Sequence, residues 1–447
     1  MKKYNTIYKV LNYENLFHDF LVIYKRFFGQ IGKSFSFITD PRNPSYITYS
    51  LECEFFTGFL INLCHLRSCN HANTNFHNSQ IIIDNFVKIF GTAAPDMDTL
   101  VFLFKQVDIE QVYQCNYNII NNLIRHKTLD YAKLLDEYWL VTFDGIQLFT
   151  SDKPLNANCL SRKLKDGTTQ YYCYVLEAKL ITPDGLCFSI AQEFVENKDL
   201  NAKKQDCEHQ AALRLIDKIK KQFPRLPICL LADGLFADGT IMKACTDGGW
   251  KWIVTLKDED LKTVNQEFDL LYHTHQHRTV NLPQNTIQNF RWFNDHQYQD
   301  TKKNTFIINI IECIEKKIDK DFTKFKYITS FRINENNFQA IVKTGRLRWT
   351  TENEGFNVQK NNDFELEHAF CKHEIAYKVF YILMQLAYTL LQLFQNSDSL
   401  KQMFKDCIKT TIALSQCILE AWRFFACQIN VNELINNSTK QFRLNTS

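Results

Sequence analysis

The pattern of apolar and polar positions predicts a helical beginning to the chain. Residues 1–130 contain long apolar stretches such as Phe55–Leu66. The segment Thr92–Leu100 (TAAPDMDTL) carries a proline followed by Asp96 and Asp98, which is typical of a helix start. We therefore predict a helical N-terminal region over residues 1–130.

Short apolar runs typical of strands follow this region. Tyr138–Phe143 (YWLVTF) is rich in strand-forming residues and stops at Asp144-Gly145. Two further runs, Tyr171–Thr182 and Leu186–Val195, are joined by Pro-Asp-Gly. Because these are turn residues, the two runs are predicted to pair as an antiparallel hairpin.

A helix and two more strands complete the predicted order. Asp206–Gln222 has an apolar face and begins at a residue suited to cap a helix. Pro227–Ala232 is wholly apolar, as in a strand buried on both faces, and Asp233 follows it. A helix-compatible stretch then leads to the strand Trp252–Leu256. Three strands, helix, strand, helix, strand is the order of the ribonuclease H-like fold, an α/β fold with a mixed five-stranded sheet and flanking helices.

The polar and apolar pattern also suggests where the remaining regions begin and end. Residues 131–256 would form the first part of a ribonuclease H-like core, and residues 257–343 a strand-rich insertion. Residues 344–428 would supply the helical remainder of the core, and residues 429–447 a polar tail.

One apolar run, Ile375–Phe394, is long enough for a membrane span on length alone. Lys378, Gln385 and Gln392 interrupt it at intervals of seven residues, which places them on one side of a helix. A buried amphipathic helix is the better interpretation. We therefore expect no membrane association.

Composition and charge change this picture little. The 447 residues include 52 Lys+Arg and 49 Asp+Glu, which gives a formal charge of +3. This charge neither favours nor excludes nucleic-acid binding, because such binding needs only a local basic surface. Fifteen cysteines are scattered along the chain, and the first twenty residues do not resemble an export signal. Reduced thiols in a cytoplasmic protein are expected.

Four zinc-capable residues offer a different chemistry. Cys64, Cys69, His71 and His77 lie within fourteen residues. Their spacing does not follow the paired pattern of zinc fingers, so buried thiols and loop histidines are the preferred interpretation.

Three carboxylates stand in positions that suggest metal-dependent chemistry. Asp144 follows the first predicted strand, Asp233 follows the fourth, and Glu352 lies in a helical stretch after the insertion. Two divalent cations about 4 Å apart can activate the attacking and leaving oxygens of a phosphodiester. Because such hard cations take oxygen ligands, we predict two Mg²⁺ or Mn²⁺ ions held by these three residues.

Each of these acids has an ordinary alternative. An Asp-Gly pair after a strand is most often only a turn, and Asp238-Gly239 repeats the dipeptide as a competitor to Asp233. Glu352 taken singly is typical of a solvated helix face. Only the joint placement of the three on the expected elements favours a site.

The sequence resembles the bacterial insertion-sequence transposases of the DDE type, which carry a Tyr-x2-Arg-x3-Glu-x6-Lys signature around the last acid. In Gly345–His368 (GRLRWTTENEGFNVQKNNDFELEH), Arg348 and Glu352 satisfy Arg-x3-Glu. The stretch Glu193–Ala237 is similar to the run around the second acid of this family, and WIVTLKD is similar to the strand that follows. The resemblance covers about residues 139–394.

The chain departs from the signature at two positions and leaves one choice open. The tyrosine position is Gly345 and the lysine position is Gln359, with Lys360 one residue late, about 100° further round a helix. Glu354 is a rival for the third acid. It lies about 200° from Glu352, so only one of the two can face the metals, and the arginine spacing favours Glu352.

The resemblance implies an activity: cutting the ends of a mobile element and joining them to target DNA. The nucleophile would be a metal-activated water in cleavage and a DNA 3′-hydroxyl in joining, without a covalent enzyme intermediate. A homodimer is expected on DNA, in the bacterial cytoplasm at the nucleoid. Two alternatives remain: a domesticated, catalytically silent DNA-binding protein, and a related nuclease that cuts without joining.

The fold that the resemblance implies predicts DNA contact from the helical N-terminal region, residues 1–130, and from the insertion. Three single residues are also predicted to contact DNA. Arg348 and Lys360 would bind phosphate, the arginine through its planar fork and the lysine as a point charge; the alternative for both is a solvated helix face. Trp292, within FRWFND, would stack on an unpaired base or else lie in the core of a small β-unit.

Overall fold

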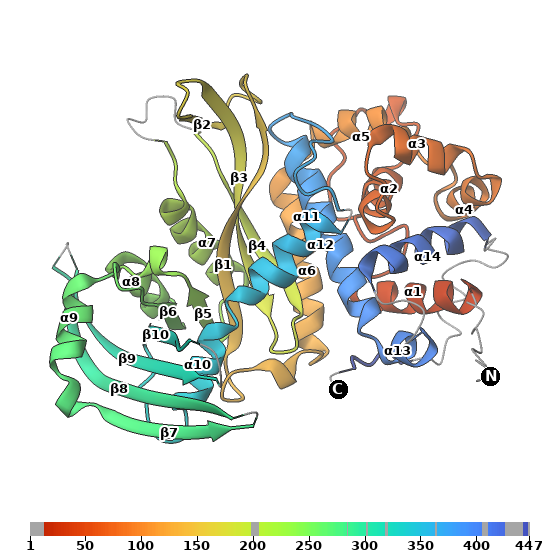
Figure 1. Ribbon diagram of the computed structural model, residues 1–447. Coiled ribbons are helices and arrows are strands. Elements are labelled where there is room, and N and C mark those ends of the chain that lie inside the picture. Colours follow the sequence, from red (N-terminus) through yellow and green to blue (C-terminus); the bar gives the residue numbers. More distant parts are fainter. Residues whose placement is uncertain are drawn as a thin grey trace, which may run out of the picture. The chain divides into compact units, whose positions relative to one another are not determined.

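The computed structural model describes residues 13–197, 205–283, 285–300, 303–317, 321–362, 364–404, 410–424 and 441–445. It divides the chain into two compact units (Figure 1). The helical unit consists of Met1–Thr128, Lys153–Asn158 and Asn357–Ser447, and the sheet unit of Leu129–Asp152 and Cys159–Phe356.

The helical unit combines the N-terminal helices with those of the C-terminal part. Its described elements are α1 (Tyr13–Phe28), η1 (Pro44–Tyr46), α2 (Leu51–Leu63), α3 (Cys69–His77), α4 (Gln80–Phe90), α5 (Met97–Phe104), α6 (Ile109–Arg125), α11 (Asn357–Asn361), α12 (Ala376–Gln395), α13 (Asp398–Phe404) and α14 (Thr411–Phe424). The predicted helical N-terminal region is thus present. Local signals explain where single helices begin and end: the Ser50 side chain accepts a hydrogen bond from the Cys53 amide at the start of α2, and Gly91, in the left-handed conformation, ends α4.

Helix α12 explains why the C-terminal helices belong to this unit. Its residues Ala376–Phe394 are all buried, and it packs against α2, α6 and α14. A helix that is buried on every side needs neighbours all around it, and the helices that supply them here belong to this unit. The predicted division, in which residues 344–428 complete the α/β core, therefore differs from the structure, where the boundary falls between Phe356 and Asn357.

The polar positions of α12 are buried as well. Lys378, Gln385 and Gln392 are all less than one-tenth exposed. The amides of Gln385 and Gln359 exchange hydrogen bonds of 2.9 and 3.1 Å, so neither amide is left without a partner. Within the described part of the chain, no helix has the length and hydropathy that a membrane span requires.

The sheet unit is a mixed α/β structure. Its described strands are β1 (Trp139–Ser151), β2 (Leu160–Lys163), β3 (Thr169–Ile181), β4 (Cys187–Val195), β5 (Ile228–Ala232), β6 (Lys251–Thr255), β7 (Gln276–Leu282), β8 (Thr286–Gln299), β9 (Thr305–Lys316) and β10 (Thr323–Thr329). Its helices are η2 (Asp130–Ala132), α7 (Glu208–Gln222), η3 (Gly234–Phe236), α8 (Gly239–Asp247), α9 (Lys262–Leu270), η4 (Tyr272–Thr274), α10 (Phe338–Arg346) and the π-helix η5 (Thr351–Phe356).

One large sheet connects these strands. Its order is β2-β3-β1-β5-β6-β10-β9-β8-β7. Strand β4 also pairs with β3, along the edge away from β1 and next to the part of β3 that follows its pairing with β2. Strands β1, β5 and β6 are parallel to one another, whereas β3 is antiparallel to β1 and β4 is antiparallel to β3. The predicted mixed sheet with flanking helices is therefore present (Figure 1), but among the described residues it has ten strands and not the predicted five.

The predicted hairpin is confirmed, but the predicted end of the first strand is wrong. Strands β3 and β4 pair antiparallel across a turn at Gly185, whose φ of 93° suits glycine. Strand β1 does not stop at Asp144-Gly145 but continues to Ser151. The reason is tertiary: β3 is equally long and pairs with β1 beyond this dipeptide, with Asp144 opposite Glu177.

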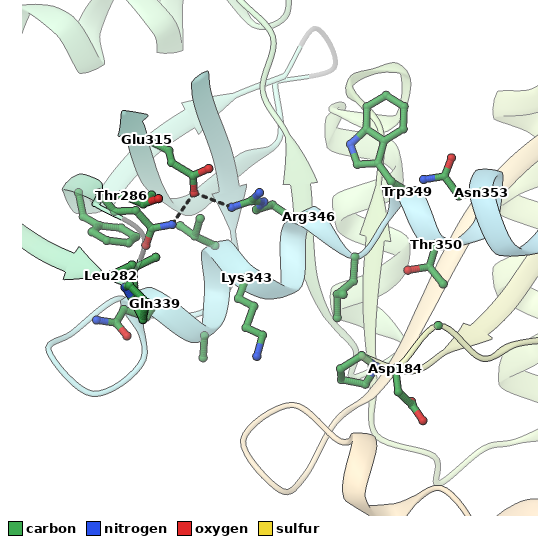
Figure 2. Close-up of a pocket in the computed structure, with 18 of the residues that line it drawn as sticks. Asp184, Leu282, Thr286, Glu315, Gln339, Lys343, Arg346, Trp349, Thr350 and Asn353 are labelled. Carbon is green, nitrogen blue, oxygen red and sulfur yellow. Dashed lines mark hydrogen bonds and ion pairs between the residues drawn. The ribbon is translucent and has the colours of Figure 1, made fainter. Parts of the chain in front are cut away.

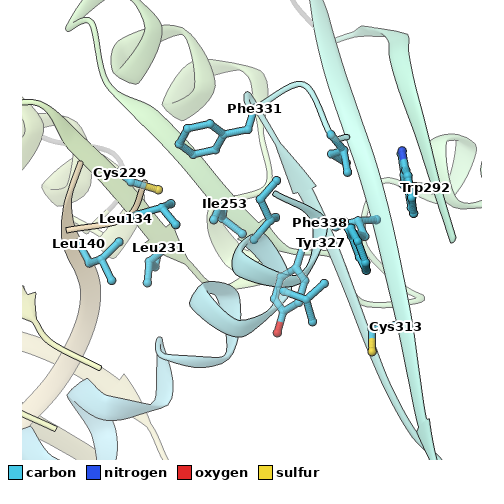
Figure 3. Close-up of a cluster of buried hydrophobic side chains, with 14 of the residues drawn as sticks. Leu134, Leu140, Cys229, Leu231, Ile253, Trp292, Cys313, Tyr327, Phe331 and Phe338 are labelled. Atoms are coloured by element: carbon cyan, nitrogen blue, oxygen red, sulfur yellow. The ribbon is translucent and has the colours of Figure 1, made fainter. Parts of the chain in front are cut away.

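The strand-rich region predicted over residues 257–343 does not form a sheet of its own. Strand β10 pairs with β6, and β9, β8 and β7 follow it, so the region extends the central sheet. One hydrophobic cluster joins the central strands to the strands of this region. It includes Leu231 and Ile253 of the central strands together with Trp292 of β8 (Figure 3).

Trp292 belongs to this core and has no exposed surface. Its ring lies 5.3 Å from that of Phe338, with an angle of 12° between the planes. Stacking on a DNA base requires a free aromatic face. The predicted DNA contact of Trp292 is therefore corrected: the residue is the core tryptophan of the alternative interpretation.

Candidate active site

The two aspartates reach the same edge of the sheet through the pairing of β1 with β5. These strands are parallel and in register from Trp139 opposite Ile228 to Thr142 opposite Leu231. Extending this register by two residues places Asp144 beside Asp233. Neighbouring strands lie about 4.8 Å apart, and residues at the same level of parallel strands point to the same face. By this extension of the register, both aspartates lie at the carboxyl end of β5, where Arg348 acts on both.

Asp144 is partly buried within β1. Its Oδ1 accepts a hydrogen bond of 2.9 Å from the amide of Gly145. Gly145 is not part of a turn: a Cβ at this position would collide with the hydroxyl of Tyr174 on β3. Burial raises the pKa of Asp144 to about 6, the Glu352 carboxylate adds to the rise, and Arg348 opposes it.

Asp233 directly follows β5 and caps η3. Its Oδ1 accepts a hydrogen bond of 2.7 Å from the Gly234 amide, and its Oδ2 lies 3.2 Å from the ammonium of Lys257. Burial alone would raise the pKa of Asp233, but the Gly234 amide and the charges of Arg348 and Lys257 outweigh it and lower the pKa. A Cβ on Gly234 would collide with the carboxylate of Asp260, so this glycine also serves close packing.

Asp238, the competitor of Asp233, has a structural role. Its Oδ1 accepts hydrogen bonds from the amides of Thr240 and Ile241 at the start of α8, at 2.7 and 3.3 Å. Its Oδ2 lies 2.6 Å from Nε2 of His209. Asp238 is therefore a helix cap, and Asp233 is the aspartate that stands level with Asp144.

Glu352 lies on the π-helix η5 with its side chain exposed. Its charge acts on Asp144, whereas Glu354 faces another neighbour: the Cγ of Glu354 lies 3.6 Å from the point where a Cβ of Gly185 would stand. The two glutamates therefore have different surroundings, and Glu352 is the one close enough to influence the first aspartate.

Arg348 connects the two aspartates electrostatically. Its charge lowers the pKa of both Asp144 and Asp233, and its side chain is only 8% exposed. The guanidinium carbon also lies 4.6 Å from the ring centre of Trp349. The buried arginine therefore compensates the carboxylates instead of extending into solvent.

The remaining signature positions have diverse surroundings. Gly345 packs so closely on the ring of Tyr327 that no side chain would fit there. Gln359 is buried against Gln385, as described above, and so is turned away from any ligand in solvent. Lys360 lies in the helical unit, where its Nζ is 2.6 Å from Glu367.

A hollow of about 1080 Å³ lies elsewhere on the sheet unit (Figure 2). Lys343, Arg346 and Trp349 line it on one side and Asp184 on another, and Glu315 bonds to Arg346 at 3.0 Å. Glu354 belongs to its lining, but Asp144, Asp233 and Glu352 do not. Glu352 nevertheless adjoins this lining along the chain, because Asn353 and Glu354 directly follow it.

The donor atoms of the three acids suit hard divalent cations, because all are carboxylate oxygens. In the described residues, no three Asp, Glu, His or Cys side chains lie close enough together to hold a metal ion as they stand. This includes the possible zinc ligands: Cys64 is buried at the end of α2, and His77 lies 3.3 Å from Asp96. Asp144 and Asp233 are the pair that the backbone aligns.

Sequence reasoning missed two charged neighbours of Asp233, namely Lys257 and Asp260. Both follow β6, whose carboxyl end lies at the same edge of the sheet as that of β5. Charged residues directly after adjacent parallel strands are a signal that could have identified them, because such residues meet at one edge.

Comparisons with known proteins give little guidance. The sequence matches no protein-family model, and it matches no curated protein. A solved structure of a piggyBac transposase synaptic complex with hairpin DNA aligns with 97% of this chain and 86% of its own, at 10% identity and a TM-score of 0.42. A likeness at this level assigns no family.

Proposed function

We propose that this protein is a DNA transposase of the DDE type, which cleaves the ends of a mobile element and transfers them to target DNA. The observation that carries the proposal is the parallel register of β1 and β5, which runs to Thr142 opposite Leu231 and, extended by two residues, brings Asp144 level with Asp233. Arg348 acts on both aspartates and Glu352 acts on the first. The order β4-β3-β1-β5-β6, with the last three strands parallel, supports the ribonuclease H-like interpretation of the core.

The three acids are proposed to hold the metal ions from two strands and one helix. Asp144 and Asp233 present oxygens from adjacent strands, and the amides of Gly145 and Gly234 hold one oxygen of each in place. Glu352, which is exposed, approaches from η5. Bound Mg²⁺ or Mn²⁺ ions would activate the attacking oxygen and stabilise the leaving oxygen of the phosphodiester.

Two cationic side chains beside the aspartates, those of Arg348 and Lys257, are proposed to bind phosphate groups of DNA. Arg348 balances the aspartates in the absence of other charge, and Lys257 bonds to Oδ2 of Asp233 through a side chain that is 46% exposed. A phosphate arriving at this edge offers both cations a new anionic partner. Lys257 is the more exposed of the two, so we assign it the phosphate contact nearest Asp233.

A metal-dependent cleavage assay tests the proposal. The full chain is incubated with a supercoiled plasmid that carries the DNA flanking the gene on both sides, with Mg²⁺, Mn²⁺ or EDTA. Wild type is expected to nick the plasmid only with metal, and Asp144→Asn, Asp233→Asn and Glu352→Gln to reduce nicking to the EDTA level. Glu354→Gln is the matched control, because it removes the same charge two residues away from Glu352, and it should retain activity.

The outcomes separate the alternatives. If wild type nicks no more than Asp233→Ala, catalysis is excluded and a silent DNA-binding protein remains. If strands are broken but never joined to a second DNA, the protein is a nuclease. If Glu354→Gln is inactive and Glu352→Gln is active, the third acid is Glu354.

A further inference from the structure

Beneath the candidate active site, a buried pair of hydroxyl groups joins β1 to η5. Thr142 and Thr351 are both fully buried, and their Oγ1 atoms share a hydrogen bond. Thr142 precedes Asp144 by two residues and therefore lies on the same face of β1. Thr351 directly precedes Glu352. One hydrogen bond thus ties the strand that carries the first acid to the helix that carries the third.

Two further contacts hold the same π-helix. A Cβ on Gly355 would lie 3.2 Å from Sγ of Cys187, so the helix passes very close to β4. The ring of Phe356 lies 5.4 Å from Nζ of Lys179, a buried residue of β3 opposite Thr142. These contacts secure the end of η5, whereas the threonine pair secures the beginning, where Glu352 is located.

We propose that the Thr142–Thr351 hydrogen bond positions Glu352 relative to Asp144 for metal binding. This inference rests on the proposed function and deepens it. Glu352 itself is exposed, so its own side chain has little packing to orient it. The backbone of η5 must supply the orientation, and a π-helix is an irregular segment that needs outside contacts to keep its geometry. Both threonines are fully buried, so we assign them a positioning role and not a direct contact with metal or DNA.

The test compares variants that are nearly identical in shape. Thr351→Val removes only the hydroxyl, which also bonds to the thiol of Cys187, and Thr351→Ser retains it. The double variant Thr142→Val/Thr351→Val removes both hydroxyls of the pair, so neither threonine hydroxyl is left without the other. Thr329→Val is the matched control: Thr329 is a fully buried threonine of β10 in the same sheet, and its hydroxyl bonds to the carbonyl of Trp252 at 2.8 Å. Circular dichroism and thermal melting establish that each variant is folded.

The readouts are the Kd for Mn²⁺, measured by electron paramagnetic resonance on the DNA-free protein, and kcat and KM for plasmid nicking. Loss of an outer-shell contact typically costs about 10-fold in metal affinity or activity. We expect Thr351→Val and the double variant to weaken Mn²⁺ binding and to lower kcat by about this factor with KM for DNA unchanged. Thr351→Ser should restore both, and Thr329→Val should leave both at the wild-type value.

Two results would overturn the inference. Either folded Thr351→Val matches wild type in Mn²⁺ affinity and kcat, or Thr329→Val shows the same loss. Failure of the proposed function looks different: wild type would then bind Mn²⁺ no better than Asp144→Asn/Asp233→Asn and would nick no more than that variant.

Discussion

Aromatic rings fill the centre of the helical unit, whereas the sheet unit buries charged side chains close to its candidate active site. Around α12, Phe104 lies 5.1 Å from Phe380 and 5.0 Å from Phe55, measured between ring centres. In the sheet unit, Lys179 and Glu177 are both fully buried, with Nζ 3.7 Å from Oε2.

This difference indicates what each interior does. Burial of apolar area stabilises a fold without requiring one exact arrangement. A buried ion pair seldom adds net stability over an apolar replacement, although breaking it is costly. Both residues of the ion pair belong to β3, and Nζ of Lys179 lies 5.4 Å from the ring of Phe356 on η5. We infer that Glu177 fixes the position of Lys179 against η5, and the predictions below test the contrast between the two units.

The largest effect is expected in the apolar core of the sheet unit. Trp292→Ala removes a fully buried ring that stacks on Phe338, and this should cost about 3–5 kcal/mol in the free energy of unfolding. Trp349→Ala is the control, because this ring is 53% exposed, and it should change stability by less than about 0.5 kcal/mol. Urea unfolding measures both. Equal losses would contradict the placement of Trp292 in the core.

The buried charges offer a direct comparison with the helical unit. Lys179→Met leaves Glu177 buried without its cation and should cost about 3–5 kcal/mol. Gln385→Leu leaves only a neutral amide, that of Gln359, without its partner and should cost about 1–3 kcal/mol.

A double variant, Lys179→Met/Glu177→Leu, tests whether the ion pair stabilises the fold or fixes the geometry of the candidate active site. It should recover most of the stability lost in Lys179→Met but not the metal-dependent nicking. Recovery of full nicking as well would show that the ion pair has no part in the arrangement of the site.

A smaller effect is expected in how the thermal stability of each unit depends on pH. Burial, together with the charges of Arg291 and His277, lowers the pKa of His275 in the sheet unit from 6.5 to about 4. Its ring lies 4.3 Å from that of Phe268. Because the folded pKa is depressed, the stability contributed by neutral His275 is present above pH 6.5 and is lost as the pH falls towards 4. His275→Phe should therefore reduce the loss of thermal stability between pH 7 and pH 4.5.

The helical unit should show the opposite dependence at Glu52. Burial raises the pKa of this carboxyl from 4.5 to about 7, against the weaker opposing effect of Lys33. Because the folded pKa is raised, the contribution of Glu52 is present below pH 4.5 and is lost as the pH rises through 7. Glu52→Gln should make the melting temperature less dependent on pH between 5 and 8. If both substitutions changed the profile in the same direction, the contrast between the units would not extend to their titrating groups.

Part of the site could be predicted because the sequence itself marks where some strands end. The apolar run before Asp233 corresponds to β5, and the turn residues between β3 and β4 predicted their hairpin. For Asp144 the predicted strand end was wrong, yet the position relative to β5 was unaffected, because the parallel register depends on the residues before it. The role of Gly145 could not be predicted, since the side chain that requires it, Tyr174, is distant in sequence.

What the sequence by itself determined is the order of elements, because apolar periodicity and turn residues act locally; the three acids that it nominates stay a prediction. The tertiary structure alone decided which contacts surround them: that Asp238 caps α8, that Thr142 bonds to Thr351, and that residues from Asn357 onward join the N-terminal helices. These choices depend on burial and on partners far away along the chain. The physical reason is that a buried polar group or an all-apolar helix is stable only where its partners have been brought together by folding.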